Sequence, residues 1–132
     1  MTRSMNPQEL RERIVAWVVD IGHAVGPLYR RRETASRADQ LKRAADSAAA
    51  NYRSAQIARS HREFTAKLSL ALEETDEAVG WLELLYRDGT IRDAEAGRLL
   101  DEGRQLTRIL ARSRETAQAR EGTSRNPNRR SR

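Results

Sequence analysis

The chain contains no cysteine, and its only aromatic residues are two tryptophans, three tyrosines and one phenylalanine. The lack of cysteine excludes disulfide bonds and thiolate catalysis and is compatible with a reducing compartment. So few aromatics leave no platform on which single-stranded bases would stack. The longest apolar run, residues 14–19, ends at Asp20 and is too short for a membrane-spanning helix, which needs about 20 residues. We therefore expect a soluble cytoplasmic protein without a membrane partner.

Several motifs of enzymes and metalloproteins are also missing. The two histidines, His23 and His61, do not follow a glutamate by three positions, which di-metal carboxylate bundles require. The glycines form no phosphate-binding loop, and no serine is framed by glycines. We expect no catalytic residue, no metal or other cofactor, and no small-molecule substrate; a small cytoplasmic enzyme is the weakest alternative. His61 is expected to be exposed and His23 partly buried.

Apolar residues at four-three spacing predict helices. The first helix is expected at residues 7–25, with Asn6 as N-cap, Pro7 at the first helical position, and Gly26 and Pro27 ending it. A second helix is expected from about residue 36 to 58. Its inner positions are mostly small, which allows a neighbouring helix to approach closely: Leu41, Ala45, Ala48, Tyr52 and Ala55.

The third helix is predicted at residues 61–87. Ser60 and Glu63 have the spacing of a capping box, in which each side chain binds a free backbone N–H group near the other. Gly89 suits a left-handed C-cap. The apolar seam repeats every four and three residues, as in left-handed bundles: Phe64, Leu68, Ala71, Thr75, Ala78, Leu82 and Leu85.

A fourth helix is expected after Asp93, its cap, with apolar or small residues at three-four spacing as far as Ala117. From Gly122 the chain reads GTSRNPNRRSR, without an apolar residue, which predicts disorder. Short connections favour antiparallel neighbours. The sequence therefore predicts an all-α, antiparallel up-down-up-down four-helix bundle at residues 1–121 and a disordered basic tail at residues 122–132.

Charge alternates along the chain. Residues 28–62 carry nine basic and three acidic groups, a net of +6, whereas residues 63–102 carry four basic and eleven acidic groups, a net of −7. Two basic sets and the tail are candidates for contact with the phosphates of RNA or DNA, which would be insensitive to base sequence and sensitive to salt. The candidate residues are Arg30, Arg31, Arg32, Arg37, Lys42, Arg43, Arg104, Arg108, Arg112, Arg129 and Arg130.

The basic residues have a second interpretation. Cations near helix C-termini are favoured by the helix dipole, and arginines can pair with the acidic third helix at Glu73, Glu74, Asp76 and Glu77. That helix also carries an outer apolar set, Leu70, Trp81 and Leu84, away from its inner seam. Isolated surface apolar residues are common; the alternative that we favour is a contact between subunits.

Residues 50–85 contain a motif made of five short segments: Ala50-Asn51-Tyr52-Arg53, Ala58-Arg59-Ser60, Glu63-Phe64, Leu72-Glu73-Glu74 and Trp81-Leu82-Glu83-Leu84-Leu85. It resembles the bacterial four helix bundle protein family, which includes proteins encoded in intervening sequences of large-subunit ribosomal RNA genes. More distantly, it is similar to the accessory variability determinant of diversity-generating retroelements. Here Ser54 stands where many relatives have glutamate, and Gln56 where they have cysteine.

The resemblance implies a homopentamer and, from the retroelement proteins, an adaptor for reverse transcriptase and nucleic acid. It also implies that the corner between the second and third helices is stabilised by Asn51, Tyr52, Arg53, Arg59, Ser60, Glu63 and Phe64. We therefore expect a non-enzymatic homo-oligomeric bundle that acts as a nucleic-acid-binding or adaptor protein. The alternative is a structural interaction module whose charges assemble only its own ring.

Overall fold

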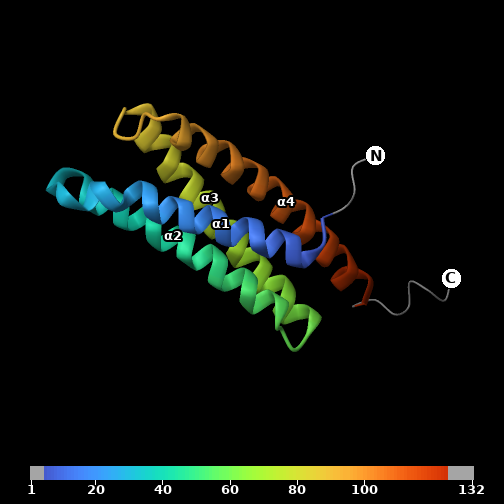
Figure 1. Cartoon of the computed structure of the whole chain (residues 1–132). Coiled ribbons are helices and arrows are strands. Elements are labelled where there is room, and N and C mark those ends of the chain that lie inside the picture. The colour runs from blue at the N-terminus through green and yellow to red at the C-terminus, as the bar shows by residue number, and fades with distance from the viewer. Residues whose placement is uncertain (1–4, 125–132) are drawn as a thin grey trace.

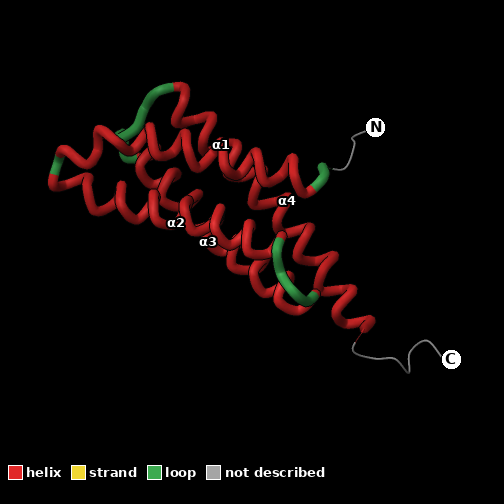
Figure 2. Tube along the Cα trace, turned by 60° about the horizontal axis from the view of Figure 1, so that its bottom comes forward, coloured by secondary structure: helices red, strands yellow, loops and turns green. Residues whose placement is uncertain are grey.

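The computed structural model describes residues 5–124 as an antiparallel bundle of four long helices. They are α1 (Pro7–Val25), α2 (Arg32–Gln56), α3 (His61–Arg87) and α4 (Ala94–Ser124), with a short 3₁₀ helix, η1 (Gly26–Arg30), before α2. The helices run alternately up and down, with short connections at both ends (Figures 1 and 2). The predicted fold is confirmed.

α1 has the predicted bounds. The side chain of Asn6 accepts a hydrogen bond from the backbone N–H of Glu9 at 2.8 Å, and Pro7 occupies the first turn, where its missing N–H costs nothing. After Val25 the chain tightens into η1 at Gly26 and Pro27. None of the helices in the described part of the chain combines the length and apolarity that crossing a bilayer requires.

α2 begins at Arg32, earlier than the predicted start at Ser36. Its N-cap residue, Arg31, makes no side-chain capping bond. Instead the hydroxyl of Thr34 reaches back and donates to the carbonyl oxygen of Leu28 at 2.6 Å. This contact fastens the first turn of α2 to η1, so the helix starts without the usual capping residue.

The corner between α2 and α3 is capped largely as predicted. The hydroxyl of Ser60 accepts from the backbone N–H of Glu63 at 3.1 Å. The carboxylate of Glu63 accepts from the N–H of Arg59 at 2.8 Å, one residue before the N-cap. Both contacts satisfy backbone donors that the helix leaves free, so the corner is fixed by local hydrogen bonds.

Replacing Ser60 with alanine should lower the free energy of unfolding by about 0.5–2 kcal/mol, because the Glu63 N–H loses its acceptor. Thermal unfolding followed by circular dichroism should show a lower midpoint with little change in helix content at low temperature. Ser36→Ala is the matched control: Ser36 lies inside α2 and is exposed, so its midpoint should hardly move. An equal shift in both variants would contradict the capping role of Ser60.

The connection between α3 and α4 uses two of the predicted residues. Gly89 has a φ of 82°, a left-handed conformation that glycine adopts without strain. The carboxylate of Asp93 accepts from the N–H of Ala96 at 2.9 Å and caps α4. α4 then continues to Ser124, so residues 122–124 extend the helix rather than beginning the tail. The predicted disorder of residues 125–132 lies outside the described residues.

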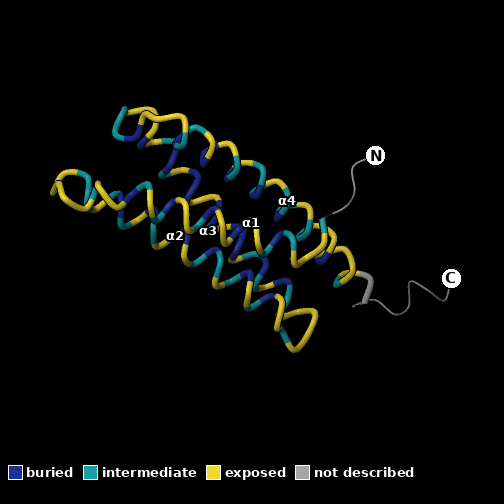
Figure 3. Tube along the Cα trace, in the orientation of Figure 1, coloured by how far each residue is buried: buried dark blue, intermediate teal, exposed yellow. Residues whose placement is uncertain are grey.

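The core lies along the inner faces of all four helices (Figure 3). Of the helix pairs in the described chain, α2 and α3 make the most extensive contact, which fits the small inner residues of α2. The indole of Trp17 in α1 is 2% exposed and donates to the carbonyl oxygen of Leu99 in α4 at 2.9 Å. A Cβ atom on Gly103 would lie 2.7 Å from both Trp17 and Val79, so glycine creates the hollow in α4 into which these side chains pack.

Candidate nucleic-acid interface

The basic residues around η1 and the first half of α2 divide into paired and unpaired groups. Arg37 bonds Asp88, Lys42 lies 2.8 Å from Asp46, and Arg43 lies 2.7 Å from Asp39. In contrast, Arg30, Arg31 and Arg32 are exposed and form no ion pair with any residue of 5–124. Only the three consecutive arginines of this set are free to contact a phosphate without breaking an existing pair.

The ion pair between Arg37 and Asp88 links α2 to the connection between α3 and α4. The hydroxyl and backbone N–H of Thr90 donate to Asp88 at 2.6 and 2.9 Å, and Arg37 approaches its other oxygen. Hydrogen bonds from Thr90 and then from Arg37 lower the pKa of Asp88 to about 2. The contribution of this carboxylate to stability is therefore complete above its ordinary pKa of 3.8 and is lost as the pH falls toward 2.

The predicted basic face of α4 is exposed. Arg104, Arg108 and Arg112 share this face at a spacing of four residues. Arg104 lies 3.7 Å from Glu83 of α3, whereas Arg108 and Arg112 have no carboxylate partner within residues 5–124. Arg129 and Arg130 lie outside the described residues. Two unpaired arginines one helical turn apart suit successive contacts along a polyanion.

The fold does not bring the two basic sets together. η1 lies at the end of the bundle that also holds the connection between α3 and α4 (Figure 1). α4 runs from there to the opposite end, where α1 begins and the corner between α2 and α3 lies, and Arg112 belongs to its second half. α2 and α4 make no direct contact within the described residues, so a ligand that touched both sets would have to pass around the bundle.

The residues that the resemblance assigned to the corner behave differently from one another. The Asn51 amide donates within its own helix to the Ser47 carbonyl at 3.0 Å. The Tyr52 hydroxyl donates to the Pro7 carbonyl at 3.3 Å, and the half-buried ring of Phe64 packs at the edge of the core. The guanidinium groups of Arg53 and Arg59 are exposed and unpaired within residues 5–124, so their surroundings suit a partner outside the bundle.

The outer face of α3 carries the predicted apolar residues. Leu70 is 40% and Leu84 is 48% exposed, while Trp81 is half-buried at the edge of the core. Sequence periodicity did not single out two exposed valines on α1, Val15 and Val19. They lie four residues apart, next to the buried face of α1. One turn of α1 therefore also presents apolar surface.

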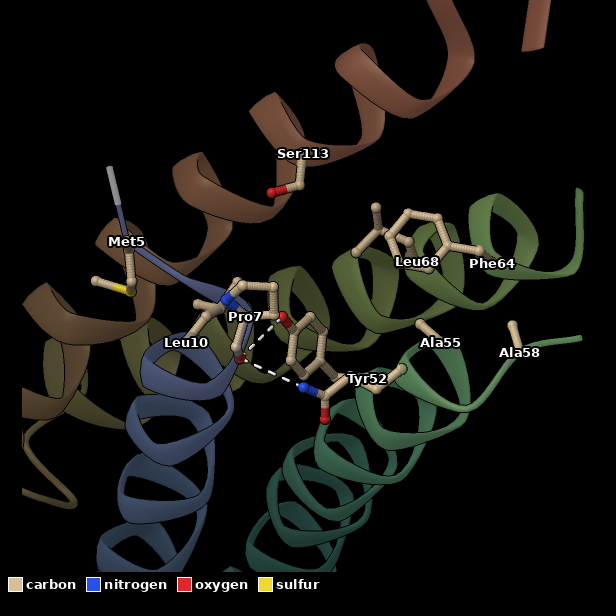
Figure 4. Close-up of a pocket in the computed structure, with 10 residues that line it drawn as sticks. Met5, Pro7, Leu10, Tyr52, Ala55, Ala58, Phe64, Leu68 and Ser113 are labelled. Atoms are coloured by element: carbon tan, nitrogen blue, oxygen red, sulfur yellow. Dashed lines mark hydrogen bonds between the residues drawn. The ribbon is translucent and has the colours of Figure 1, made fainter. Parts of the chain in front are cut away.

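A cavity of about 400 Å³ lies at the corner end of the bundle, where all four helices meet (Figure 4). Most of its wall is apolar. The Tyr52 hydroxyl and the Gln56 amide both donate to the Pro7 carbonyl, and the Ser113 hydroxyl donates to Ile109 within α4. Because these polar groups already have partners, the cavity suits an apolar group better than a charged one.

No cluster of three or more potential metal ligands occurs within residues 5–124. His23 is exposed, so the prediction that it is partly buried is wrong; its position in α1 points away from the face that buries Trp17 and Ile21. His61 is exposed as predicted. Its Nε2 lies 2.8 Å from the carbonyl oxygen of Ala117 and joins the first turn of α3 to α4.

The comparisons with known proteins agree with this architecture. A protein of unknown function from the S23 ribosomal protein family of Bacteroides thetaiotaomicron VPI-5482, solved as a crystal structure, superposes with a TM-score of 0.76. The two sequences are 25% identical, and the match covers 84% of this chain and 99% of the other. No curated protein matches the chain. Residues 15–112 match the family model described as 23S rRNA-intervening sequence protein, and the chain belongs to that family.

Proposed function

We propose that the chain is a non-enzymatic, homo-oligomeric helical bundle that binds nucleic acid and acts as an adaptor. The observation that carries this proposal is the set of exposed arginines without carboxylate partners among residues 5–124, including Arg108 and Arg112 on α4. Arginine binds phosphate oxygens through a planar fork of donors. Reverse transcriptase is the protein partner that we propose by analogy with the retroelement proteins that the motif resembles.

Self-association is the second part of the proposal. The exposed Leu70 and Leu84 on α3 would be buried against another subunit, and the family resemblance suggests five subunits. An oligomer would also multiply each basic patch into a larger positive field, which speeds and strengthens binding to a polyanion.

We expect sedimentation or light scattering to show several subunits for the native chain and smaller species for Leu84→Glu, because assembly would bury an unpaired charge. Ile57→Glu is the matched control: Ile57 is 73% exposed at the corner between α2 and α3, and its substitution should leave assembly intact. A native monomer at micromolar concentration would end the oligomer proposal. An assembled Leu84→Glu variant would place the interface elsewhere.

Binding to RNA and DNA should fall steeply as salt rises from about 50 to 200 mM, because each neutralised phosphate releases counterions. It should vary little with base sequence. Deleting residues 125–132 removes four arginines and no acidic residue, so the slope of log affinity against log salt should become shallower while assembly persists. Fluorescence anisotropy with labelled RNA and DNA measures this. If the native oligomer binds neither at about 50 mM salt, the nucleic-acid proposal fails.

One observation favours the alternative, a structural module without a nucleic-acid ligand. None of Glu73, Glu74, Asp76 and Glu77 forms an ion pair within residues 5–124. Burial raises the pKa of the Glu74 carboxyl, and the neighbouring Glu77 and Glu73 raise it further. A cation from another subunit would relieve this repulsion. In that case Arg108→Glu with Arg112→Glu should break the oligomer, whereas the nucleic-acid proposal expects loss of binding with assembly intact.

A further inference from the structure

The two ends of the bundle differ in net charge. The end that carries the consecutive arginines Arg30, Arg31 and Arg32 is the less basic of the two. We define the corner end as residues 7–14, 50–68 and 110–124, and the turn end as residues 18–39 and 80–101. The hydrogen bond from Gln56 to Pro7 and the contact of His61 with Ala117 hold the segments of the corner end together. Figure 1 shows the two ends at opposite extremes of the bundle.

The turn end is nearly neutral despite Arg30, Arg31 and Arg32. It contains seven basic and eight acidic residues, a net of −1. Several of its cations are already engaged: Arg37 bonds Asp88, and Arg98 lies 2.6 Å from Glu95. Asp88, Asp93 and Glu95, from the connection between α3 and α4 and the start of α4, belong to this end as well. A phosphate approaching it would therefore meet both signs of charge.

The corner end is basic. It contains nine basic and five acidic residues, a net of +4. Of the nine cations, only Arg13 forms an ion pair with a carboxylate of the described chain, Glu102. The tail adds four arginines and no acid directly after this end. Each end holds two helix N-termini and two C-termini, so the dipoles largely cancel and the side chains determine the sign of the field.

We infer that the corner end, rather than η1, is the surface that binds nucleic-acid phosphates, an inference that rests on the proposed function. Three segments would supply the contacts: the last turn of α2 with the connection that follows it, the first turn of α3, and the C-terminal half of α4. The exposed arginines of these segments have no ion-pair partner within residues 5–124, so binding a phosphate breaks no existing pair. They are Arg53, Arg59, Arg62, Arg112 and Arg120. No base-specific contact is implied, because phosphate contacts fix position without reading sequence.

Two matched triple variants test the inference. Arg53→Glu, Arg59→Glu and Arg62→Glu reverse three charges at the corner end; Arg30→Glu, Arg31→Glu and Arg32→Glu reverse three at the turn end. Both sets give the chain the same net charge. The two sites are separated by about 32 Å of α2 at 1.5 Å per residue, well beyond the Debye length of about 10 Å at 0.1 M salt. A general charge effect and a local contact can therefore be told apart.

The measurement is anisotropy of a labelled single-stranded RNA and of its DNA counterpart with the full chain. Three lost phosphate contacts should weaken binding on the order of a hundredfold near 50 mM salt and reduce the salt slope by about 2. The turn-end variant should lose less than about tenfold, since its charges are screened from the corner end. Circular dichroism and light scattering check that both variants stay folded and assembled. If the glutamate triple does not fold, Arg53→Gln, Arg59→Gln and Arg62→Gln replace it, with the same change of slope expected.

Each other outcome overturns the inference in a distinct way. Equal losses in both variants mean that net charge alone drives binding, and a larger loss in the turn-end variant returns the site to η1; in both cases the proposed function stands. Tighter binding of polyglutamate than of either nucleic acid indicates an acidic protein partner at the corner end. No binding of the native chain to RNA or DNA removes the proposed function together with the inference.

Discussion

Replacing Trp17 with alanine should lower the free energy of unfolding by about 3–5 kcal/mol, the largest effect that we expect from a single substitution. The side chain is 2% exposed and reaches from α1 to α4, where it fills the hollow above Gly103. Its removal would leave a cavity in the core and take away the indole N–H that donates to the Leu99 carbonyl. Chemical denaturation followed by circular dichroism measures the loss.

The second tryptophan of the chain provides the control. Trp81 is half-buried on the outer side of α3. Trp81→Ala should therefore lower the free energy of unfolding of one subunit clearly less than Trp17→Ala does. Trp17→Phe keeps most of the packing but loses the hydrogen bond to Leu99. Its free energy of unfolding should therefore lie between those of the native chain and the alanine variant. If Trp17→Ala and Trp81→Ala were equally stable, the indole of Trp17 would not be a central contact of the core.

Gly103→Ala should destabilise the bundle by roughly 1–2 kcal/mol, although alanine is the better helix former. The added methyl would lie 2.7 Å from Trp17 and Val79, and overpacking of this kind costs about 1–3 kcal/mol. The gain in helix propensity, up to about 1 kcal/mol, offsets only part of that.

Gly22→Ala in α1 is the matched substitution with the opposite expected sign. No heavy atom lies within 4 Å of a Cβ on Gly22, so only the gain in helix propensity remains, up to about 1 kcal/mol. The midpoints of the two variants should therefore move in opposite directions on chemical denaturation. A stabilised Gly103→Ala variant would show that α1 can shift outward at no cost.

The helix ends that sequence predicted best are those fixed by local chemistry. Asn6 and Pro7 begin α1, Ser60 begins α3, and Asp93 caps α4, each through a contact within four residues along the chain. The start of α2 was missed because it depends on a different kind of contact. Thr34 is tied back to η1 through the Leu28 carbonyl, and no rule of capping residues indicates such a start.

The candidate interface was harder to predict than the fold. Sequence draws attention to Arg30, Arg31 and Arg32 because they are consecutive. Whether a cation is free depends on residues distant in sequence, such as Asp88 beside Arg37. Conversely, Arg53 and Arg62 are separated in the sequence, yet both belong to one end of the bundle. Local charge density therefore indicated that a basic surface exists but not which end of the fold carries it.

The last turns of α4 extend past the point where the helix is anchored. Ala117 is buried, and residues 118–122 after it are exposed or half-buried. The carbonyl oxygen of Ala117 is held by His61. A peptide as short as residues 118–124 would not be helical in water by itself, since starting a helix costs more than extending one. These turns are helical because they propagate from the anchored segment. Arg120 and the attachment point of the tail therefore keep their positions only while the junction between His61 and Ala117 holds, and fraying from that junction would release them without opening the core.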